Sequence, residues 1–348
     1  MARIAVAGAG AIGASVAYHL ALRGARDVVL ADRGEVASGS TGKAMGGVRQ
    51  QFSTEPEVRL ARDSIRFFEE LGDRWFQQVG YVFLATTEDG LAELEARMEL
   101  QRGLNVPVER VAVPPGVRAD DVLGAVACRS DGVADPPAVT RELVRRAAER
   151  GVEVRERTRA EELDHDVLVV ACGPWSAEVA AQHGVELPIR PLCRQLLETA
   201  PLRDLPPDLS MVIELETTFH FRRRDDRLRI AMVDAAPRWG FEEVVDDSVF
   251  DDRLRRLEHR YPAAAGTTID RAWAGLYDMT PDAHPVIGRV ADGIYAACGF
   301  SGHGFMQSPA VGRALAELIL EGETAYDLSP FALERFARDA VFPEEVVL

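Results

Sequence analysis

Two glycine-rich segments at opposite ends of the chain have the residue types and spacing for binding negatively charged groups. The first is "GAGAIG", residues 8–13, and the second is "GFSGHGFMQSPAVG", residues 299–312, which contains His303. Each segment runs into a stretch with helical spacing, and the first N–H groups of a helix have no acceptor within that helix. Both segments are therefore candidate anion sites, and a single ligand that uses both needs a fold that brings them together.

The first segment has the pattern of a dinucleotide-binding turn. It follows the apolar run "RIAVA" and opens the helical pattern "AIGASVAYHLALRG", after which a second apolar run ends at Asp32. In such a unit Gly8 makes the tight turn, Gly10 lets the backbone approach a pyrophosphate, and Gly13 lets the helix pack closely on the strand. The Asp32 carboxylate is predicted to accept hydrogen bonds from a ribose 2′-hydroxyl, and it disfavours NADP because it repels a 2′-phosphate.

The segment after Asp32 bears on which dinucleotide binds. A nicotinamide enzyme usually continues with a second regular strand–helix repeat, whereas this chain continues with the glycine-, serine- and threonine-rich loop "ASGSTGKAMGGVRQ". Such a loop can lay backbone N–H groups and the hydroxyls of Ser40 and Thr41 along a long cofactor. The glycine turn by itself does not separate NAD from FAD, and this loop favours FAD.

Composition narrows the class of protein. The chain has 348 residues, 47% of them hydrophobic and 28% charged, which is typical of a soluble globular protein with one large or two medium domains. A net charge of −16 argues against nucleic-acid binding. No apolar run is long enough for a membrane span, and "MARIAVAGAG" does not have the pattern of a signal peptide, so we expect a cytoplasmic protein. Its four cysteines form no CxxC pair, which predicts neither a zinc or other metal site nor a disulfide framework.

The order of predicted elements indicates two domains. Material with βαβ pattern at the start, middle and end of the chain is interrupted twice by strand-rich material, including "GYVFLATT", "RQLLET", "FHFRRR" and "RLRIAMV". We predict an α/β plus α+β fold. A discontinuous Rossmann-like FAD-binding domain comprises residues 1–78, 140–185 and 272–348, and an inserted antiparallel β-sheet substrate domain comprises residues 79–139 and 186–271.

Five segments together resemble the flavin-dependent amino-acid oxidoreductases of the D-amino-acid oxidase superfamily. They are "GAGAIGASVAYHLALRG", "VASGSTGKAMGGVRQ", "DVLVVACGPWS", "WAGLYDMTPDAHPVIG" and "CGFSGHGFMQSPAVG", in that order. Within the superfamily the chain is most similar to β subunits of heterotetrameric sarcosine oxidases, to related proline dehydrogenases and to dimethylglycine-type enzymes. The resemblance implies FAD bound in an extended form beneath a β-sheet substrate domain. It also shows a departure, because an extra β-meander that the family usually has before "DVLVV" is almost absent here.

The resemblance places the second glycine-rich segment at the pyrimidine edge of the flavin. Negative charge develops there when the flavin accepts a hydride, and N–H groups at a helix N-terminus would stabilise that charge. Gly302 and Gly304 would allow a close approach that a Cβ would block. The implied cofactor-binding residues are Gly8, Gly10, Ala11, Ile12, Gly13, Asp32, Arg33, Ser40, Thr41, Lys43, Gly46, Gly47, Ala160, Gly173, Trp175, Gly302, His303, Gly304, Phe305 and Met306.

Three positions compared with the family bear on the substrate. D-Amino-acid and glycine oxidases clamp the substrate carboxylate with an arginine in the "GLRP" version of this chain's "GLYD", where Tyr277 stands. Sarcosine-type enzymes have a tyrosine there and clamp the carboxylate with an arginine that matches Arg49 and a lysine that matches Met306. Arg49 suits this role because its planar fork matches a carboxylate. The predicted carboxylate clamp therefore has one of its two cations, Arg49, and lacks the other at position 306.

Covalent attachment of the flavin is not expected. Lys43 stands where dimethylglycine-type enzymes have the flavin-bonding histidine, and Gly275 stands where monomeric sarcosine oxidases have the flavin-bonding cysteine. Neither residue can form those bonds. The cofactor is therefore predicted to be non-covalent FAD.

Two histidines complete the set of candidate active-site residues. His303 lies in the second glycine-rich segment and is expected near the flavin. His220 lies on a predicted strand, where alternation puts it on one face with Arg222 and puts Phe219 and Phe221 on the other. Periodicity leaves open whether the His220 face points into a substrate cavity or to solvent. Arg229 on the next strand loosely matches, by spacing alone, a lysine that promotes oxygen reactivity in some oxidases.

These observations predict an FAD-dependent enzyme that oxidises the C–N bond of a small secondary or tertiary amino acid by hydride transfer to flavin N5. Candidate substrates are sarcosine, proline and N-methyl amino acids, and the candidate active-site residues are Arg49, Tyr277, His220, Met306 and His303. Two alternatives stay open: a flavin-dependent 2-hydroxy-acid oxidoreductase and a non-catalytic FAD-binding subunit. The electron acceptor can be O₂ or an electron-transfer partner protein, and a homo- or hetero-oligomer is possible on this sequence.

Overall fold

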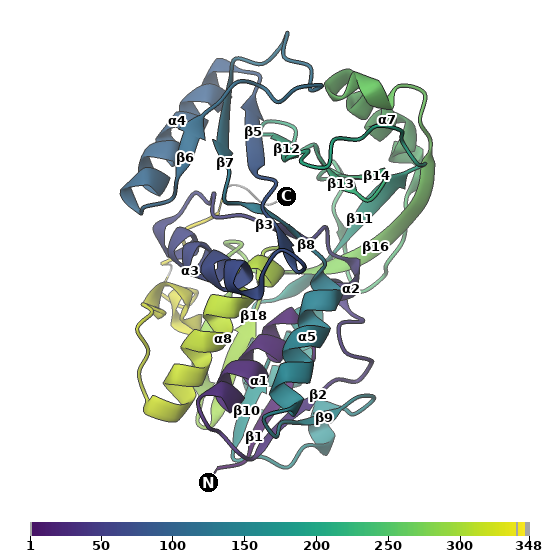
Figure 1. The fold of residues 1–348 in the computed structure, drawn as a ribbon. Helices are drawn as coiled ribbons and strands as arrows, with labels where there is room; N and C mark the ends of the chain where they lie inside the picture. Colours follow the sequence, from purple (N-terminus) through teal and green to yellow (C-terminus); the bar gives the residue numbers. More distant parts are fainter. Residues whose placement is uncertain (1, 339, 345–348) are drawn as a thin grey trace.

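A computed structural model describes residues 2–338 and 340–344 of the chain. Figure 1 shows two regions, one holding β1, β2, β10 and the helices α1, α5 and α8, and the other holding the larger sheet. The predicted fold class is confirmed, because strands from distant parts of the chain assemble into two sheets that belong to different regions.

The smaller region is built on a six-stranded sheet in the order β17-β18-β10-β1-β2-β9. Five of its strands run parallel to one another: β1, β2, β9, β10 and β18. Strand β17 is antiparallel to β18. The strands come from three separate parts of the sequence, which makes this domain discontinuous as predicted. Their bounds are β1 Ile4–Ala7, β2 Val28–Ala31, β9 Glu153–Arg155, β10 Val167–Val170, β17 Val286–Ala291 and β18 Ile294–Cys298.

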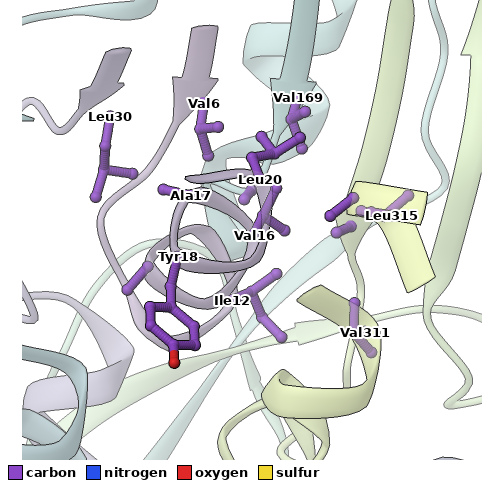
Figure 2. Close-up of a cluster of buried hydrophobic side chains, with 14 of the residues drawn as sticks. Val6, Ile12, Val16, Ala17, Tyr18, Leu20, Leu30, Val169, Val311 and Leu315 are labelled. Carbon is purple, nitrogen blue, oxygen red and sulfur yellow. The ribbon is translucent and has the colours of Figure 1, made fainter. Parts of the chain in front are cut away.

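Three helices cover one face of this sheet: α1 (Ala11–Leu22), α5 (Pro136–Ala148) and α8 (Gly304–Glu321). Helix α1 lies between the other two, and nearly all of its side chains are buried. Figure 2 shows how Val16 and Leu20 of this helix lie among side chains of the strands and of α8. A helix enclosed in this way is apolar on all sides instead of on one stripe. The short helix α6 (Ser176–Ala181) packs against β10.

The larger region is a nine-stranded sheet in the order β15-β11-β14-β13-β12-β5-β7-β6, with β16 paired to β11. Helices α4 (Glu88–Gly103) and α7 (Phe250–Arg260) pack against it. The strands are β5 Tyr81–Ala85, β6 Val108–Arg110, β7 Gly124–Cys128, β11 Arg190–Thr199, β12 Met211–Glu214, β13 His220–Arg224, β14 Arg227–Ala231, β15 Arg238–Trp239 and β16 Ile269–Met279.

The prediction of an antiparallel substrate sheet needs one correction. Strands β5 and β12 pair in parallel, while the other pairs of this sheet are antiparallel. Each of the two strands comes from a different inserted segment, so no hairpin joins them and no turn forces them to run in opposite directions.

Smaller elements join the two regions. A three-stranded sheet in the order β3-β8-β4 lies beside α3 (Glu55–Leu71), and α2 (Ser40–Lys43) contacts β16. The strands are β3 Gly47–Val48, β4 Phe76–Gln77 and β8 Gly132–Ala134, and the 3₁₀ turns are η1 Ala160–Glu162, η2 Gly173–Trp175, η3 Asp247–Val249, η4 Pro262–Ala264, η5 Ser329–Phe331 and η6 Leu333–Arg335.

Two of the predicted domain boundaries fall inside regular elements. Helix α5 starts at Pro136, because Asp135 caps it by accepting a hydrogen bond from the Ala138 N–H, so the boundary at 140 lies within the helix. Strand β16 runs through the boundary at 272 and stays paired with β11 on both sides of it. The rest of the domain division stays a prediction. Only η1 stands between β9 and β10, where the sequence lacks the family's extra β-meander.

Among residues 2–338 and 340–344, no helix combines the length and apolar character needed to cross a membrane.

Candidate active site and cofactor cavity

A cavity of about 920 Å³ is lined by residues of both sheets. It brings together all five candidate active-site residues, which come from distant parts of the chain. Every candidate cofactor-binding residue also lines it, with the exception of Gly13. The roles of these residues in binding FAD or substrate stay predictions.

The β1–α1 turn requires glycine at two positions for packing reasons. Gly8 has φ +103°, and a Cβ there would lie 2.3 Å from the Ala171 carbonyl oxygen. A Cβ at Gly13 would lie 1.8 Å from the Gly8 carbonyl oxygen. Gly13 therefore serves the close packing of α1 on the turn and does not need to touch a ligand. The N–H of Ala11 donates to Thr41 Oγ1 at 3.0 Å, while the first turn of α1 faces the cavity.

The Asp32 carboxylate stands at the carboxyl end of β2 and lines the cavity. Its Oδ2 accepts from the Ala9 N–H at 2.8 Å, and its Oδ1 accepts from the Gly34 N–H at 2.7 Å. Each oxygen retains a lone pair for a ribose hydroxyl. The same carboxylate therefore holds two loops in place and is available to a dinucleotide.

We expect Asp32→Ala to weaken FAD binding by about ten- to a hundredfold, because charge-assisted hydrogen bonds to the ligand and to the loop are lost. Titrating apoprotein with FAD and following quenching of flavin fluorescence measures the dissociation constant. Asp27→Ala is the matched control, since Asp27 lies just before the same strand and is exposed, with an Arg3 ion pair of 3.4 Å. Unchanged FAD affinity in Asp32→Ala would remove this carboxylate from the cofactor site.

The loop before β3 is held against β16 and β8. The Ser40 hydroxyl donates to the Leu276 carbonyl at 2.7 Å, so it ties α2 to β16. Gly46 has φ +84°, and a Cβ there would lie 2.4 Å from the Ala134 carbonyl oxygen. A Cβ at Gly47 would lie 1.5 Å from the hydroxyl oxygen of Tyr81. These two glycines are required by neighbouring protein atoms, in addition to any ligand.

The N-terminus of α8 opens toward the cavity. His303 is its N-cap and makes no side-chain cap hydrogen bond, and Gly304, Phe305 and Met306 of the first turn line the cavity. Gly302 precedes it with φ +101°. A close approach of the flavin at these two glycines stays a prediction, and protein atoms also restrict both positions: a Cβ at Gly302 would lie 2.4 Å from Cε2 of Tyr277, and one at Gly304 would lie 3.2 Å from the Phe300 side chain. Both would strike protein side chains.

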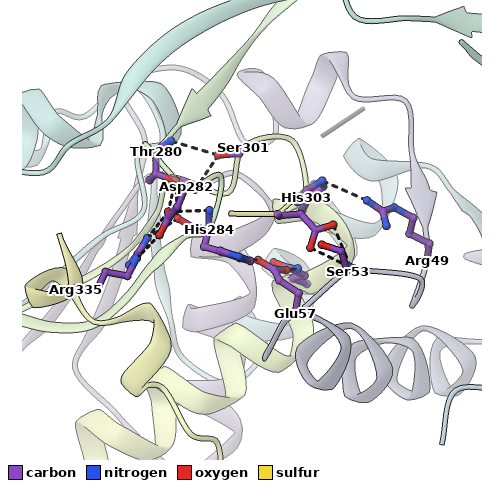
Figure 3. A network of polar contacts seen from close by, with 12 residues as sticks. Arg49, Ser53, Glu57, Thr280, Asp282, His284, Ser301, His303 and Arg335 are labelled. Atoms are coloured by element: carbon purple, nitrogen blue, oxygen red, sulfur yellow. Dashed lines mark hydrogen bonds and ion pairs between the residues drawn. The ribbon is translucent and has the colours of Figure 1, made fainter. Parts of the chain in front are cut away.

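A buried polar network supports this helix terminus (Figure 3). Glu57 Oε1 lies 2.7 Å from His284 Nδ1, and Glu57 also accepts from the Gln307 side chain on α8. Both members of the Glu57–His284 pair are fully buried. Nearby, Arg335 pairs with Asp282 at 2.8 Å. The network joins α3, α8 and the loop between β16 and β17, and so limits movement of the helix terminus.

Arg49 and His303 lie together at the cavity, as Figure 3 also shows. Arg49 is 1% exposed, its Nη1 donates to the Gln51 carbonyl, and its Nη2 lies 3.4 Å from His303 Nε2. The guanidinium lies 4.0 Å from the ring centroid of Phe52, and the same ring packs edge-on against His303. Burial lowers the pKa of Arg49, a shift that the carboxylate of Glu344 opposes. Arg49 is thus no exposed loop charge.

His220 and Arg222 face inward. They are 4% and 2% exposed, and the His220 side chain lines the cavity. His220 Nδ1 lies 2.8 Å from the Thr218 carbonyl oxygen, which can only accept, so this nitrogen carries the proton and Nε2 has a free lone pair. Burial lowers the pKa of His220 to about 4, so the imidazole is neutral at pH 7. The Arg222 Nε donates to the Met45 carbonyl at 2.7 Å and holds the loop before β3.

Arg229 does not reach the cavity lining. Its Nε pairs with Glu198 at 3.0 Å, and its guanidinium lies 5.1 Å from the Trp273 ring centroid. The spacing match to an oxygen-reactivity lysine therefore has no support in the arrangement of these side chains.

Other predicted residues that line the cavity contact neighbouring side chains. The Arg33 guanidinium lies 3.9 Å from the Trp175 ring, which in turn stacks on Phe241 at 5.7 Å. Lys43 forms an ion pair with Glu243. Sequence reasoning missed the cavity residues Tyr81, Arg194, Met211 and Phe241. A charge inside the mostly apolar run "PLCRQLL" is the sequence signal that could have indicated Arg194.

The arrangement fits an extended dinucleotide. A glycine turn, a carboxylate at the end of β2 and a second helix N-terminus without a side-chain cap all line one cavity. The model of the FAD dependent oxidoreductase family (DAO) matches residues 3–318, and the chain belongs to that family. The family's cofactor is FAD, which the residues present can hold.

Named relatives lie within the same family. The chain is 26% identical to 4-methylaminobutanoate oxidase (formaldehyde-forming) of Paenarthrobacter nicotinovorans, covering 96% of this chain and 46% of that protein. It is 28% identical to glycine oxidase of Geobacillus kaustophilus (strain HTA426), covering 95% and 96%. The crystal structure of L-proline dehydrogenase from P. horikoshii superposes with a TM-score of 0.91 at 27% identity, covering 98% of this chain and 99% of that one.

The chain spans less than half the length of some curated relatives. Sarcosine dehydrogenase of Mus musculus is 26% identical over 96% of this chain, which is 41% of that protein. Membership of the FAD dependent oxidoreductase family rests on this chain's own match over residues 3–318.

Proposed function

We propose that this enzyme oxidises the C–N bond of a small secondary or tertiary amino acid, such as sarcosine, proline or another N-methyl amino acid. FAD, when bound, supplies the hydride acceptor at N5. The observation that carries the proposal is a buried arginine, Arg49, at a cavity whose lining includes the neutral imidazole of His220 and the apolar thioether of Met306. The chain's task is to bind and orient the substrate.

Arg49 is placed to hold the substrate carboxylate. The contacts of its guanidinium with Gln51 and Phe52 fix its orientation before a ligand arrives. A pre-oriented guanidinium gives a charge-assisted pair with little loss of side-chain freedom. This contact distinguishes an amino acid from a simple amine.

The neutral His220 favours an amine over a 2-hydroxy acid. Oxidation of a hydroxy acid needs a base for the hydroxyl proton, and an imidazole with a pKa of about 4 is a weak base at pH 7. An amine can lose its proton to water before it binds, so its oxidation needs no strong base in the site. The lone pair on His220 Nε2 can accept a hydrogen bond from the substrate nitrogen.

Apolar side chains suit an alkylated nitrogen. Met306 and Phe305 on α8 and Met211 on β12 line the cavity. They offer no partner to the extra N–H groups of a primary ammonium, while an N-methyl group or a pyrrolidine ring can pack against them. Three relatives have names that refer to methylated or cyclic amines, namely 4-methylaminobutanoate, sarcosine and proline, while glycine oxidase is named for a primary amine.

Anaerobic stopped-flow reduction of the flavin tests the proposal. We expect sarcosine, proline or N,N-dimethylglycine to reduce it faster than glycine, D-alanine or lactate. Fastest reduction by lactate would favour the 2-hydroxy-acid alternative, and fastest reduction by D-alanine would overturn the substrate class. No reduction by any of these compounds, with FAD still bound, would favour a non-catalytic FAD-binding subunit.

The flavin is proposed to be non-covalent. A Cβ added to Gly275 would lie 3.0 Å from the Lys43 side chain, and neither residue can bond to a flavin. Acid precipitation of the purified protein is expected to leave the yellow colour in the supernatant. Colour retained in the pellet would contradict this prediction.

The electron acceptor, location and assembly are proposed on sequence grounds alone. O₂ or an electron-transfer partner protein would reoxidise the flavin. The protein would be cytoplasmic and would form a homo- or a hetero-oligomer. Comparing the rates of reoxidation by O₂ and by an artificial acceptor such as ferricenium distinguishes an oxidase from a dehydrogenase. Reoxidation by O₂ at the rate of turnover would make a partner protein unnecessary.

A further inference from the structure

An arginine of β11, Arg194, lies on the cavity face of the larger sheet. Arg194 stands near the middle of β11, opposite Gly275 of β16. Residues at opposite positions of an antiparallel pair share a face, and the Lys43 side chain lies beside Gly275. Arg194, Gly275 and Tyr277 all line the cavity.

Two nitrogens of the Arg194 guanidinium have no hydrogen-bond partner. Its Nε and Nη1 are buried and make no hydrogen bond, and among the described residues no carboxylate forms an ion pair with it. By contrast, the Lys43 ammonium, which also lines the cavity, forms an ion pair with Glu243. Buried donors are rarely left without an acceptor, and a ligand that supplies one explains the exception.

Arg194 and Arg49 act on the same tyrosine. The Arg194 guanidinium carbon lies 5.8 Å from the ring centroid of Tyr277. Burial raises the pKa of the Tyr277 phenol, and the positive charges of Arg194 and then of Arg49 oppose that rise. The Tyr277 side chain is therefore within electrostatic reach of both guanidinium groups, which come from β11 and from the segment after β3.

We propose that Arg194 is the second cationic contact for the substrate carboxylate and so a specificity-determining residue of this site. This inference rests on the proposed function, since it assumes that the substrate is an amino acid. The family resemblance places a second cation at position 306, where this chain has an apolar side chain in the core around α3 and β5. Arg194 supplies the missing charge from a different strand. A carboxylate oxygen would accept from one of these two buried donors, because the Nε–H and the Nη1 N–H groups point to different sides of the planar guanidinium.

A ligand titration that needs no turnover tests the assignment. FAD-loaded protein is titrated with pyrrole-2-carboxylate and with its uncharged analogue pyrrole-2-carboxamide, and the flavin absorption spectrum is followed. For Arg194→Gln we expect the dissociation constant of the carboxylate to rise about ten- to a hundredfold, with that of the carboxamide nearly unchanged. Arg190→Gln is the matched control on the same strand, because Arg190 is exposed and packs on Trp239 at 4.4 Å. It should bind both ligands like the wild type.

Thermal unfolding supplies a second readout. A structural role for Arg194 would make Arg194→Gln less stable, whereas removal of unpaired buried donors should leave the Tm of the apoprotein unchanged or higher. Equal weakening of both ligands, a lower Tm, or a loss of FAD affinity without loss of carboxylate selectivity would overturn the assignment. So would a wild type that binds no carboxylate.

The two proposals fail in different ways. If no amino acid reduces the flavin but Arg194→Gln still loses carboxylate selectivity, the proposed reaction is wrong and the anion contact stands. If an N-methyl amino acid reduces the flavin rapidly and Arg194→Gln binds carboxylates like the wild type, the reaction stands and Arg194 has no part in it.

Discussion

Replacing Arg49 by alanine is expected to lower kcat/KM for the preferred amino acid by about ten- to a hundredfold, the loss of one charge-assisted pair with a carboxylate. The effect should be large because Arg49 is 1% exposed and its contacts with Gln51, Phe52 and His303 fix its position. Anaerobic stopped-flow reduction over a range of substrate concentrations measures the change in rate and in apparent affinity.

Two further variants serve as controls for Arg49→Ala. Arg49→Lys retains a positive charge without the planar fork and should lie between wild type and Arg49→Ala. Arg59→Ala removes an exposed arginine on α3 that pairs with Glu55 at 2.6 Å, so it should leave the kinetics unchanged. An Arg49→Ala enzyme with wild-type kcat/KM for an amino acid would remove the clamp from the mechanism.

Replacing Gly302 by valine is expected to destabilise the protein by about 2–5 kcal/mol and to slow flavin reduction. Backbone strain at φ +101° contributes about 1–2 kcal/mol of this. Overpacking adds about 1–3 kcal/mol, because the new Cβ would lie 2.4 Å from Cε2 of Tyr277. Displacement of Tyr277 and of the α8 N-terminus disturbs the cavity, which explains the kinetic effect. Urea unfolding of the apoprotein and stopped-flow reduction measure the two parts.

Gly24→Val is the matched control for backbone strain. Gly24 has φ +89°, and a Cβ there meets no atom within 4 Å, so the change carries the strain without the clash. It should cost about 1–2 kcal/mol and leave flavin reduction unchanged. Equal destabilisation of the two variants would show that contact with Tyr277 does not constrain position 302.

Strand β13 of the larger sheet shows what the alternation of side chains predicts and what it leaves open. Alternation correctly grouped His220 with Arg222 and the two phenylalanines on the other face of β13, since successive side chains of a strand point to opposite faces. Both faces of this strand are buried, one against α7 and its neighbours and the other against the cavity. A period of two separates faces, but it carries no information about what packs on each.

The sequence by itself determined the dinucleotide turn, because its glycines and the aspartate after the second strand are related by short-range geometry within one βαβ unit. It also indicated the two domains and the family, through the order of its segments. Only the tertiary structure decided which charges meet. Arg49 contacts His303 on α8, and Arg194 reaches the cavity through pairing of β11 with β16. Such contacts join residues far apart in the chain, so their geometry follows from packing of the whole molecule and from the register of its sheets, and local propensity does not encode either.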